Sequence, residues 1–104
     1  MYKEAFIGAI HAKRKIRVTF YSKEDAGTIE RTCATMDYGP SRRAHEKNDR
    51  FHFWDYDSDT ERHVLSLSPE QVTDMRVLDE DFEPSEFVTW RTQWFIPRDW
   101  GTYS

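Results

Sequence analysis

Residues 50–57 constrain the fold more than any other part of the chain, because five rings fall within eight positions. Side chains of a strand alternate between its two faces, so Phe51 and Phe53 share one face with Asp55. The other face carries the remaining rings, those of His52, Trp54 and Tyr56. A strand with one face in water would show polar residues on that face. Bulky groups on both faces therefore predict an interior strand, with Phe51 and Phe53 in the core.

Four other stretches have strand patterns and are separated by residues that favour turns. Apolar and polar residues alternate over 16–21, and a Thr-rich segment follows over 28–36. The pattern of this second segment changes near Cys33, which predicts a β-bulge there. Residues 61–67 and 73–78 are predicted as two further short strands. Between them, Ser68-Pro69-Glu70-Gln71 has the residues that begin a helical turn.

Helices are predicted at both ends of the chain. Over residues 2–13, apolar side chains recur every three or four positions, which is typical of an amphipathic helix. Trp90 and Trp94 are four residues apart and would share one helical face, and Pro97 would end that helix. The expected fold is mainly β with flanking helices: a small, partly open five-stranded barrel between an N-terminal and a C-terminal helix.

Length and composition exclude several classes of protein. The 104 residues predict a single domain over 1–104. A net charge of -4 argues against a protein that coats nucleic acid by charge alone. Cys33 is the only cysteine, so no internal disulfide can form. No apolar run approaches the ~20 residues of a membrane span, and no secretory leader pattern is present. We therefore expect a cytoplasmic protein without membrane contact.

The sequence offers little for catalysis or metal binding. Asp55, Asp57 and Asp59 have the spacing of a calcium loop, but Thr60 replaces its glycine and Ser66 its final glutamate. The histidines are too scattered for a local zinc motif, although His52 and His63 could meet across a hairpin. There is no glycine-rich phosphate loop and no nucleophile elbow. We predict no enzyme activity, cofactor or metal; a two-histidine metal site or a small hydrolase is the alternative.

Rings beside arginines are the positive signal for ligand binding. A nucleobase can stack on Trp or Tyr, and Arg can hold a phosphate through two parallel hydrogen bonds. The candidate binding residues for a nucleotide or single-stranded nucleic acid are Arg42, Arg43, Arg50, His52, Trp54 and Tyr56. The alternative is that these rings belong to the core beneath one of the helices.

The aromatic stretch, read as Arg-Phe-His-Phe-Trp-Asp-Tyr-Asp, resembles the signature strand of WYL domains and places residues 51–53 on the signature positions. Residues 9–21 are similar to the opening of that family: a helix with Ala-Ile, a basic link and a first strand. Residues 64–72 are similar to its later strand, and residues 81–84 to the segment that leads into its terminal helix. The likeness covers about residues 3–90, which leaves about 89–104 as an aromatic C-terminal extension.

The resemblance implies a stand-alone WYL-like domain with an Sm-like or SH3-like barrel. It also implies a non-enzymatic ligand-binding or regulatory module, since members of this family often sense nucleotides or nucleic acid and act in transcription or defence. A second hypothesis is a protein-interaction or oligomerisation module, possible because the extension has more tryptophan than anchoring a short helix requires. Its candidate partner-binding residues are Trp90, Trp94 and Trp100.

Overall fold

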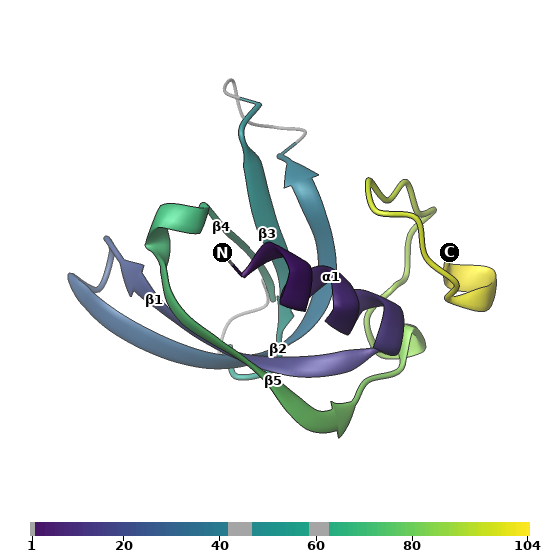
Figure 1. Ribbon diagram of the computed structural model, residues 1–104, viewed down its shortest axis with the longest axis horizontal. Coiled ribbons are helices and arrows are strands. Elements are labelled where there is room, and N and C mark those ends of the chain that lie inside the picture. Colours follow the sequence, from purple (N-terminus) through teal and green to yellow (C-terminus); the bar gives the residue numbers. More distant parts are fainter. Residues whose placement is uncertain (1, 42–46, 59–62) are drawn as a thin grey trace.

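The computed structural model describes residues 2–41, 47–58 and 63–104, which form one α-helix and five strands (Figure 1). In chain order these are α1 (Lys3–Ala12), β1 (Arg14–Ser22), β2 (Gly27–Pro40), β3 (Asp49–Asp55), β4 (Val64–Leu67) and β5 (Val72–Asp81). Three short 3-10 turns complete the described elements: η1 (Pro69–Gln71), η2 (Pro84–Glu86) and η3 (Gly101–Tyr103). Within these residues, no helix has both the length and the apolar character that crossing a bilayer requires.

The five strands form one antiparallel sheet in the order β4-β3-β2-β1-β5. A mainly β fold with five strands and an N-terminal helix is therefore confirmed. β4 and β5 lie at the two edges of this order, and the described strands do not close into a ring. The predicted barrel is thus not confirmed, because the sheet remains open between its edge strands.

β3 is an interior strand, as predicted, with β2 on one side and β4 on the other. Phe51 and Phe53 are 2% and 0% exposed, which confirms that they face the core. Both rings pack edge to face against Phe6 of α1, with ring centroids 4.9 and 5.2 Å apart. Such ring pairs add about 0.5–1.5 kcal/mol each beyond their area burial. α1 therefore covers one face of the sheet (Figure 1) and leaves the opposite face of β3 and β4 for other contacts.

β2 contains the irregularity that the sequence predicts near Cys33, but it lies slightly later. The pairing of β2 with β3 shifts its register between Thr35 and Asp37. Residues 33–37 are all buried, so the alternation of inner and outer side chains is lost here. An extra residue on one strand bends it and redirects the following side chain. Beyond the shift, the Asp37 carboxylate accepts hydrogen bonds from the C-terminal segment.

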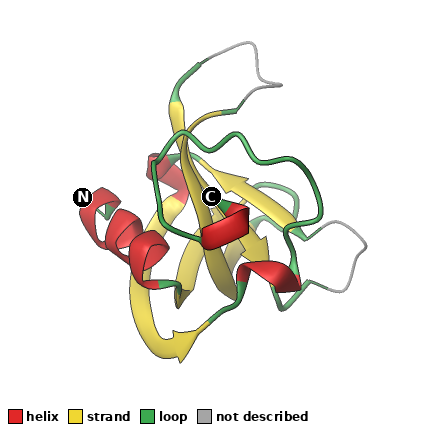
Figure 2. Ribbon diagram, turned by 90° about the vertical axis from the view of Figure 1, so that its right-hand side faces the viewer, coloured by secondary structure: helices red, strands yellow, loops and turns green. Residues whose placement is uncertain are grey.

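The predicted C-terminal helix is not formed: residues 88–100 have no regular secondary structure. The N–H groups of Phe95 and Ile96 donate to the Asp37 carboxylate, at 2.9 and 3.0 Å, rather than to carbonyls one helical turn earlier. We call residues 89–104 the C-terminal strap. Figure 2 looks onto the side of the molecule where the strap passes in front of the sheet.

Candidate ligand-binding groove

A groove of about 840 Å³ lies between the sheet and the strap. Its floor is the outer face of β3 and β4 and includes His52, Trp54, Val64 and Ser66. The opposing wall comes from the strap and includes Trp90, Arg91, Gln93, Trp94 and Phe95. Ligand pockets commonly measure ~300–1,000 Å³ and combine rings with a few polar groups. The aromatic strand and the Trp-rich tail, which are far apart in the sequence, thus form the two sides of one groove.

His52 is fixed in the floor by bonds to both neighbouring strands. Its Nδ1 lies 2.7 Å from Oγ of Ser66, which is directly opposite on β4, and its Nε2 lies 2.9 Å from the Gly39 carbonyl oxygen. A carbonyl oxygen can only accept a hydrogen bond. In the neutral ring, Nε2 therefore carries the proton and Nδ1 accepts from the Ser66 hydroxyl. Because both nitrogens are used, the π face and the carbon atoms of the ring remain for contacts in the groove.

Trp54 stands on the core and presents part of its ring to the groove. The indole stacks on the buried Phe87 ring, with centroids 5.5 Å apart and planes at 16°, and lies 5.0 Å from the His63 ring. These contacts fix the ring plane, which removes part of the ordering cost of stacking a ligand. Across the groove, Trp90 is 42% exposed and offers a second ring.

Tyr56, the third ring of the predicted surface, is not brought together with His52 and Trp54. β3 ends before it, and its hydroxyl donates to Oε1 of Glu86 at 3.2 Å. The ammonium of Lys15 lies 4.6 Å from the centre of its ring. Burial, reinforced by the neighbouring Glu86 carboxylate, raises the pKa of Tyr56. This tyrosine therefore joins β3 to β1 and η2 rather than lining the groove.

The predicted anion contacts are only partly placed. Arg50 lies near the start of β3, is half-buried and does not line the groove. Its Nε is buried and has no hydrogen-bond partner among the described residues. Arg42 and Arg43 lie outside the described residues, directly after Ser41, which does line the groove. Arg91, an exposed residue of the groove wall, was not among the residues predicted from the sequence. An isolated arginine is part of no sequence pattern that could have indicated a site.

The three predicted partner-binding tryptophans have different environments. Trp90 is exposed, whereas Trp94 is half-buried and packs between Trp90 and Trp100, with centroids 6.1 and 5.5 Å away. Trp100 is only 3% exposed, and its Nε1 donates to the Ile10 carbonyl of α1 at 2.9 Å. Trp100 therefore anchors the strap to the core, and this burial does not fit a partner-binding role.

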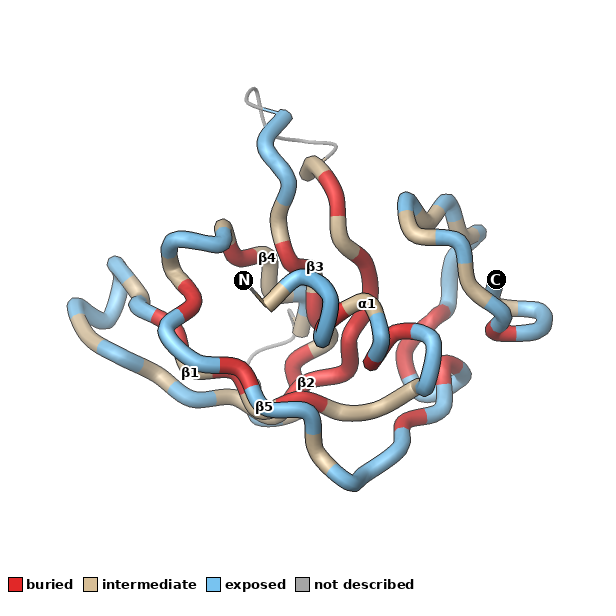
Figure 3. Tube along the Cα trace, in the orientation of Figure 1, coloured by how far each residue is buried: buried red, intermediate tan, exposed pale blue. Residues whose placement is uncertain are grey.

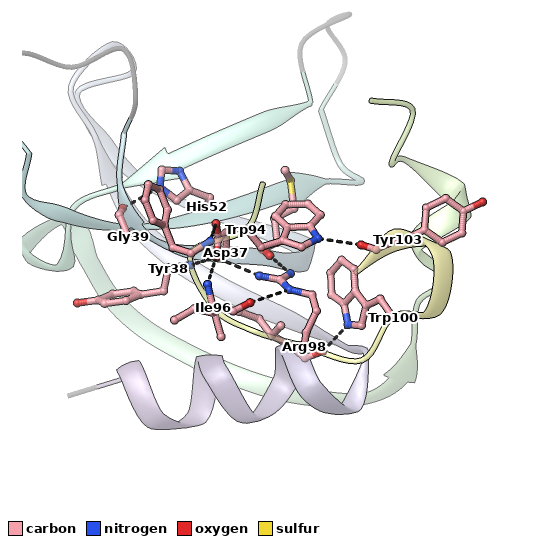
Figure 4. A network of polar contacts seen from close by, with 12 residues as sticks. Asp37, Tyr38, Gly39, His52, Trp94, Ile96, Arg98, Trp100 and Tyr103 are labelled. Atoms are coloured by element: carbon pink, nitrogen blue, oxygen red, sulfur yellow. Dashed lines mark hydrogen bonds and ion pairs between the residues drawn. The ribbon is translucent and has the colours of Figure 1, made fainter. Parts of the chain in front are cut away.

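A buried ion pair that the sequence did not reveal holds the strap beside the groove. The Arg98 guanidinium is 0% exposed, and its Nη2 lies 3.0 Å from Oδ1 of Asp37. Figure 4 shows the guanidinium between the Trp94 and Trp100 rings, 4.2 and 4.4 Å from their centres. Burial lowers the pKa of Arg98 to about 10, against the opposing effect of Asp37, so the group stays charged at neutral pH.

The hydrogen bonds of Asp37 decide the charge that the groove offers a ligand. Its carboxylate lines the groove but accepts from the N–H groups of Tyr38, Phe95 and Ile96 and pairs with Arg98. Its negative charge is thus neutralised and its lone pairs are engaged. Arg91 is exposed at the same groove. The described lining therefore favours a ligand that combines an aromatic ring with negative charge.

A second, smaller cavity of about 180 Å³ borders Asp55, Arg31 and His63. Asp55 is 6% exposed, and Oδ2 lies 3.3 Å from Nε of Arg31. Burial raises the pKa of Asp55 and outweighs the lowering by the Asp57 N–H bond and by Arg31. Within the described ranges, no three His, Cys, Asp or Glu side chains gather where they could hold a metal ion.

Comparison of the chain with protein-family models, with curated proteins and with solved structures finds no match. The site is therefore interpreted from its own geometry.

Proposed function

We propose that this protein is a non-enzymatic binding module that recognises a nucleotide or a short single-stranded nucleic acid in the groove between β3, β4 and the strap. The single observation that carries the proposal is that Trp54 and Trp90 line opposite sides of one groove of about 840 Å³. Arg91 belongs to the lining of the same groove. Stacking of one base on an aromatic side chain contributes about 1–3 kcal/mol and tolerates any base. The exposed guanidinium of Arg91 supplies a contact for a phosphate group.

The groove fits a small number of nucleotides better than a long strand. Arg91 is the only lysine or arginine in the described lining of the groove. The whole chain carries a net charge of -4. Extended binding of nucleic acid needs a basic track that follows the backbone. Arg42 and Arg43 remain part of the proposal as further anion contacts, on the evidence of the sequence alone. The resemblance to WYL domains favours the same kind of ligand sensing, coupled to a partner that acts on transcription. The Sm-like barrel of that family stays a proposal for this chain.

Tryptophan fluorescence tests this function directly. The wild-type protein is titrated at low salt with AMP, a cyclic dinucleotide, and short single-stranded DNA and RNA. We expect a saturable change with at least one of them, and weaker binding in Arg91→Ala and in Arg42→Ala/Arg43→Ala. Arg76→Ala is the matched control, because this exposed arginine lies on β5, at the opposite edge of the sheet from β4. No change with any of these ligands would contradict the proposal.

A specific observation also favours a second candidate function, binding of a protein partner or a second copy of the chain. Tyr21, Val64, Val77, Trp90 and Phe95 are the exposed large hydrophobic residues among those described. Three of them, Val64, Trp90 and Phe95, line the groove. Grouped apolar exposure of this kind marks interaction surfaces. Sedimentation of the wild type and of Trp90→Ser over a range of concentrations separates the two functions, since only an oligomer would dissociate on substitution.

A further inference from the structure

Hydrogen bonds and an ion pair join the strap to β2 beside the groove. The Phe95 and Ile96 N–H groups and the Arg98 guanidinium converge on the carboxylate of Asp37, and Arg98 also donates to the Met36 carbonyl (Figure 4). Met36 and Asp37 occupy the irregular part of β2, where the register with β3 shifts. The bulge thus supplies the acceptors that hold the strap against the sheet.

Gly39 controls how closely the strap can approach. A Cβ built on Gly39 would lie 2.6 Å from Cδ2 and 2.8 Å from Cγ of the Phe95 ring, closer than packed carbon atoms come. Only glycine therefore lets Phe95 lie against β2 in this position. The Gly39 carbonyl also accepts the hydrogen bond from His52 in the groove floor. One residue thus touches both sides of the groove.

The part of the strap that forms the wall has little support of its own. Figure 3 shows this part largely exposed, in contrast to the buried Trp100 that follows. Two of its polar bonds stay inside the strap: Thr92 Oγ1 donates to the Ser104 carbonyl at 2.6 Å, and Trp94 Nε1 to the Tyr103 carbonyl at 2.8 Å. Segments with few buried contacts open at a lower free energy than the core. The position of the wall over the floor therefore depends on the contacts at Asp37 together with the buried Trp100, on which Trp94 packs.

We propose that ligand binding in the groove is coupled to docking of the strap, with Asp37, Gly39 and Arg98 as positioning residues. The inference rests on the proposed function only in that the groove binds an aromatic ligand. A ligand that touches floor and wall binds the docked form alone and stabilises it. The apparent Kd rises in proportion as the docked fraction falls. Conversely, a bound ligand protects the strap from opening.

The test uses 8-anilinonaphthalene-1-sulfonate as the probe, an aromatic anion that does not depend on the nucleotide assignment, with AMP in parallel. Trypsin reports strap docking by cleavage after Arg98, whose side chain is 0% exposed when docked. The variant is Gly39→Ala, and its control is Gly8→Ala, where a new Cβ meets nothing within 4 Å. Arg98→Lys serves as a second variant that leaves the groove lining unchanged, and circular dichroism checks that each variant retains its sheet.

In the wild type and Gly8→Ala, we expect slow cleavage after Arg98 and further protection by the probe. In Gly39→Ala, we expect cleavage about tenfold faster, from the cost of overpacking, and probe affinity weakened only as far as the docked fraction itself falls. Unchanged cleavage in Gly39→Ala, no protection by bound probe, or no probe binding to the wild type would each overturn the coupling. If AMP and the other nucleotide ligands of the fluorescence titration all fail to bind while the probe shows the expected pattern, the nucleotide function falls and the coupling stands.

Discussion

Asp37 of β2 and Arg98 of the strap form a buried ion pair, 3.0 Å between Oδ1 and Nη2, across 61 positions of the chain. The two side chains are 9% and 0% exposed, so neither charge is hydrated to a useful extent. Backbone groups complete the hydrogen bonding of both partners, since Asp37 accepts from two strap N–H groups and Arg98 donates to the Ile96 carbonyl at 3.1 Å. A pair satisfied in this way specifies one position of the strap.

Arg98→Met should destabilise the protein strongly, because it leaves the Asp37 carboxylate buried without its countercharge. Breaking a buried pair on one side costs about 3–5 kcal/mol. Urea unfolding followed by tryptophan fluorescence measures the free energy of unfolding. Arg91→Met is the matched control: it makes the same chemical change in the same segment at an exposed arginine, and we expect a loss under about 0.5 kcal/mol. Equal losses in the two variants would contradict the role of the pair.

Trp100→Ala and Trp90→Ala should separate stability from binding. Trp100 is buried against Phe82, with ring centroids 5.5 Å apart, and its removal should cost about 3–5 kcal/mol of unfolding free energy. Trp90 is 42% exposed, so its removal should cost less than about 1 kcal/mol. We expect Trp90→Ala nonetheless to abolish the fluorescence response to ligand. Binding by Trp90→Ala with wild-type affinity would remove this ring from the site.

The sequence was sufficient for the core side of the sheet and insufficient for the strap, for a physical reason. The alternation of Phe51 and Phe53 is a local consequence of strand geometry, so the buried face of β3 could be predicted. The conformation of the strap depends on a distant acceptor. The Asp37 carboxylate binds the N–H groups of Phe95 and Ile96, which lie 58 and 59 positions later in the chain. The spacing of Trp90 and Trp94 fits a helix equally well, and no local signal records that distant carboxylate.

The same reasoning explains which site residues were found. His52 and Trp54 share a face by alternation, and both line the groove. Tyr56 follows the same alternation in sequence, but β3 ends at Asp55 and the chain turns there. Arg91 belongs to the groove only because the strap folds back over the sheet. A residue placed by a long-range contact carries no periodicity from which it could be inferred.

Titration of the Asp55 carboxyl group should lower the free energy of unfolding as pH rises. Burial raises its folded-state pKa above the unfolded value of about 3.9. Between these two values the folded state holds more protons than the unfolded state, so the free energy of unfolding decreases with rising pH. Asp55→Asn should therefore gain stability relative to the wild type as pH increases from below about 3.9 through this window. Asn keeps the Oδ1 acceptor for the Asp57 N–H, which lies 2.9 Å away.

The difference between the unfolding free energies of the two proteins, measured by urea unfolding at each pH, isolates this group. Asp74→Asn is the control, because Asp74 is an exposed aspartate on β5. A constant difference between wild type and Asp55→Asn across the range would show that the buried carboxyl does not titrate differently in the two states.

In its neutral form, the His52 ring should be a single tautomer, with the proton on Nε2. The Gly39 carbonyl oxygen, 2.9 Å from Nε2, can only accept, whereas the Ser66 hydroxyl, 2.7 Å from Nδ1, can donate. Long-range ¹⁵N–¹H correlation of the imidazole rings distinguishes the two tautomers, and the exposed His11 of α1 is an internal reference for an unconstrained ring. Ser66→Ala should preserve the Nε2 proton, because the Gly39 carbonyl alone still requires it. A dominant Nδ1 proton in the wild type would mean that β2 does not hold the ring, and that its nitrogens remain available to a ligand in the groove.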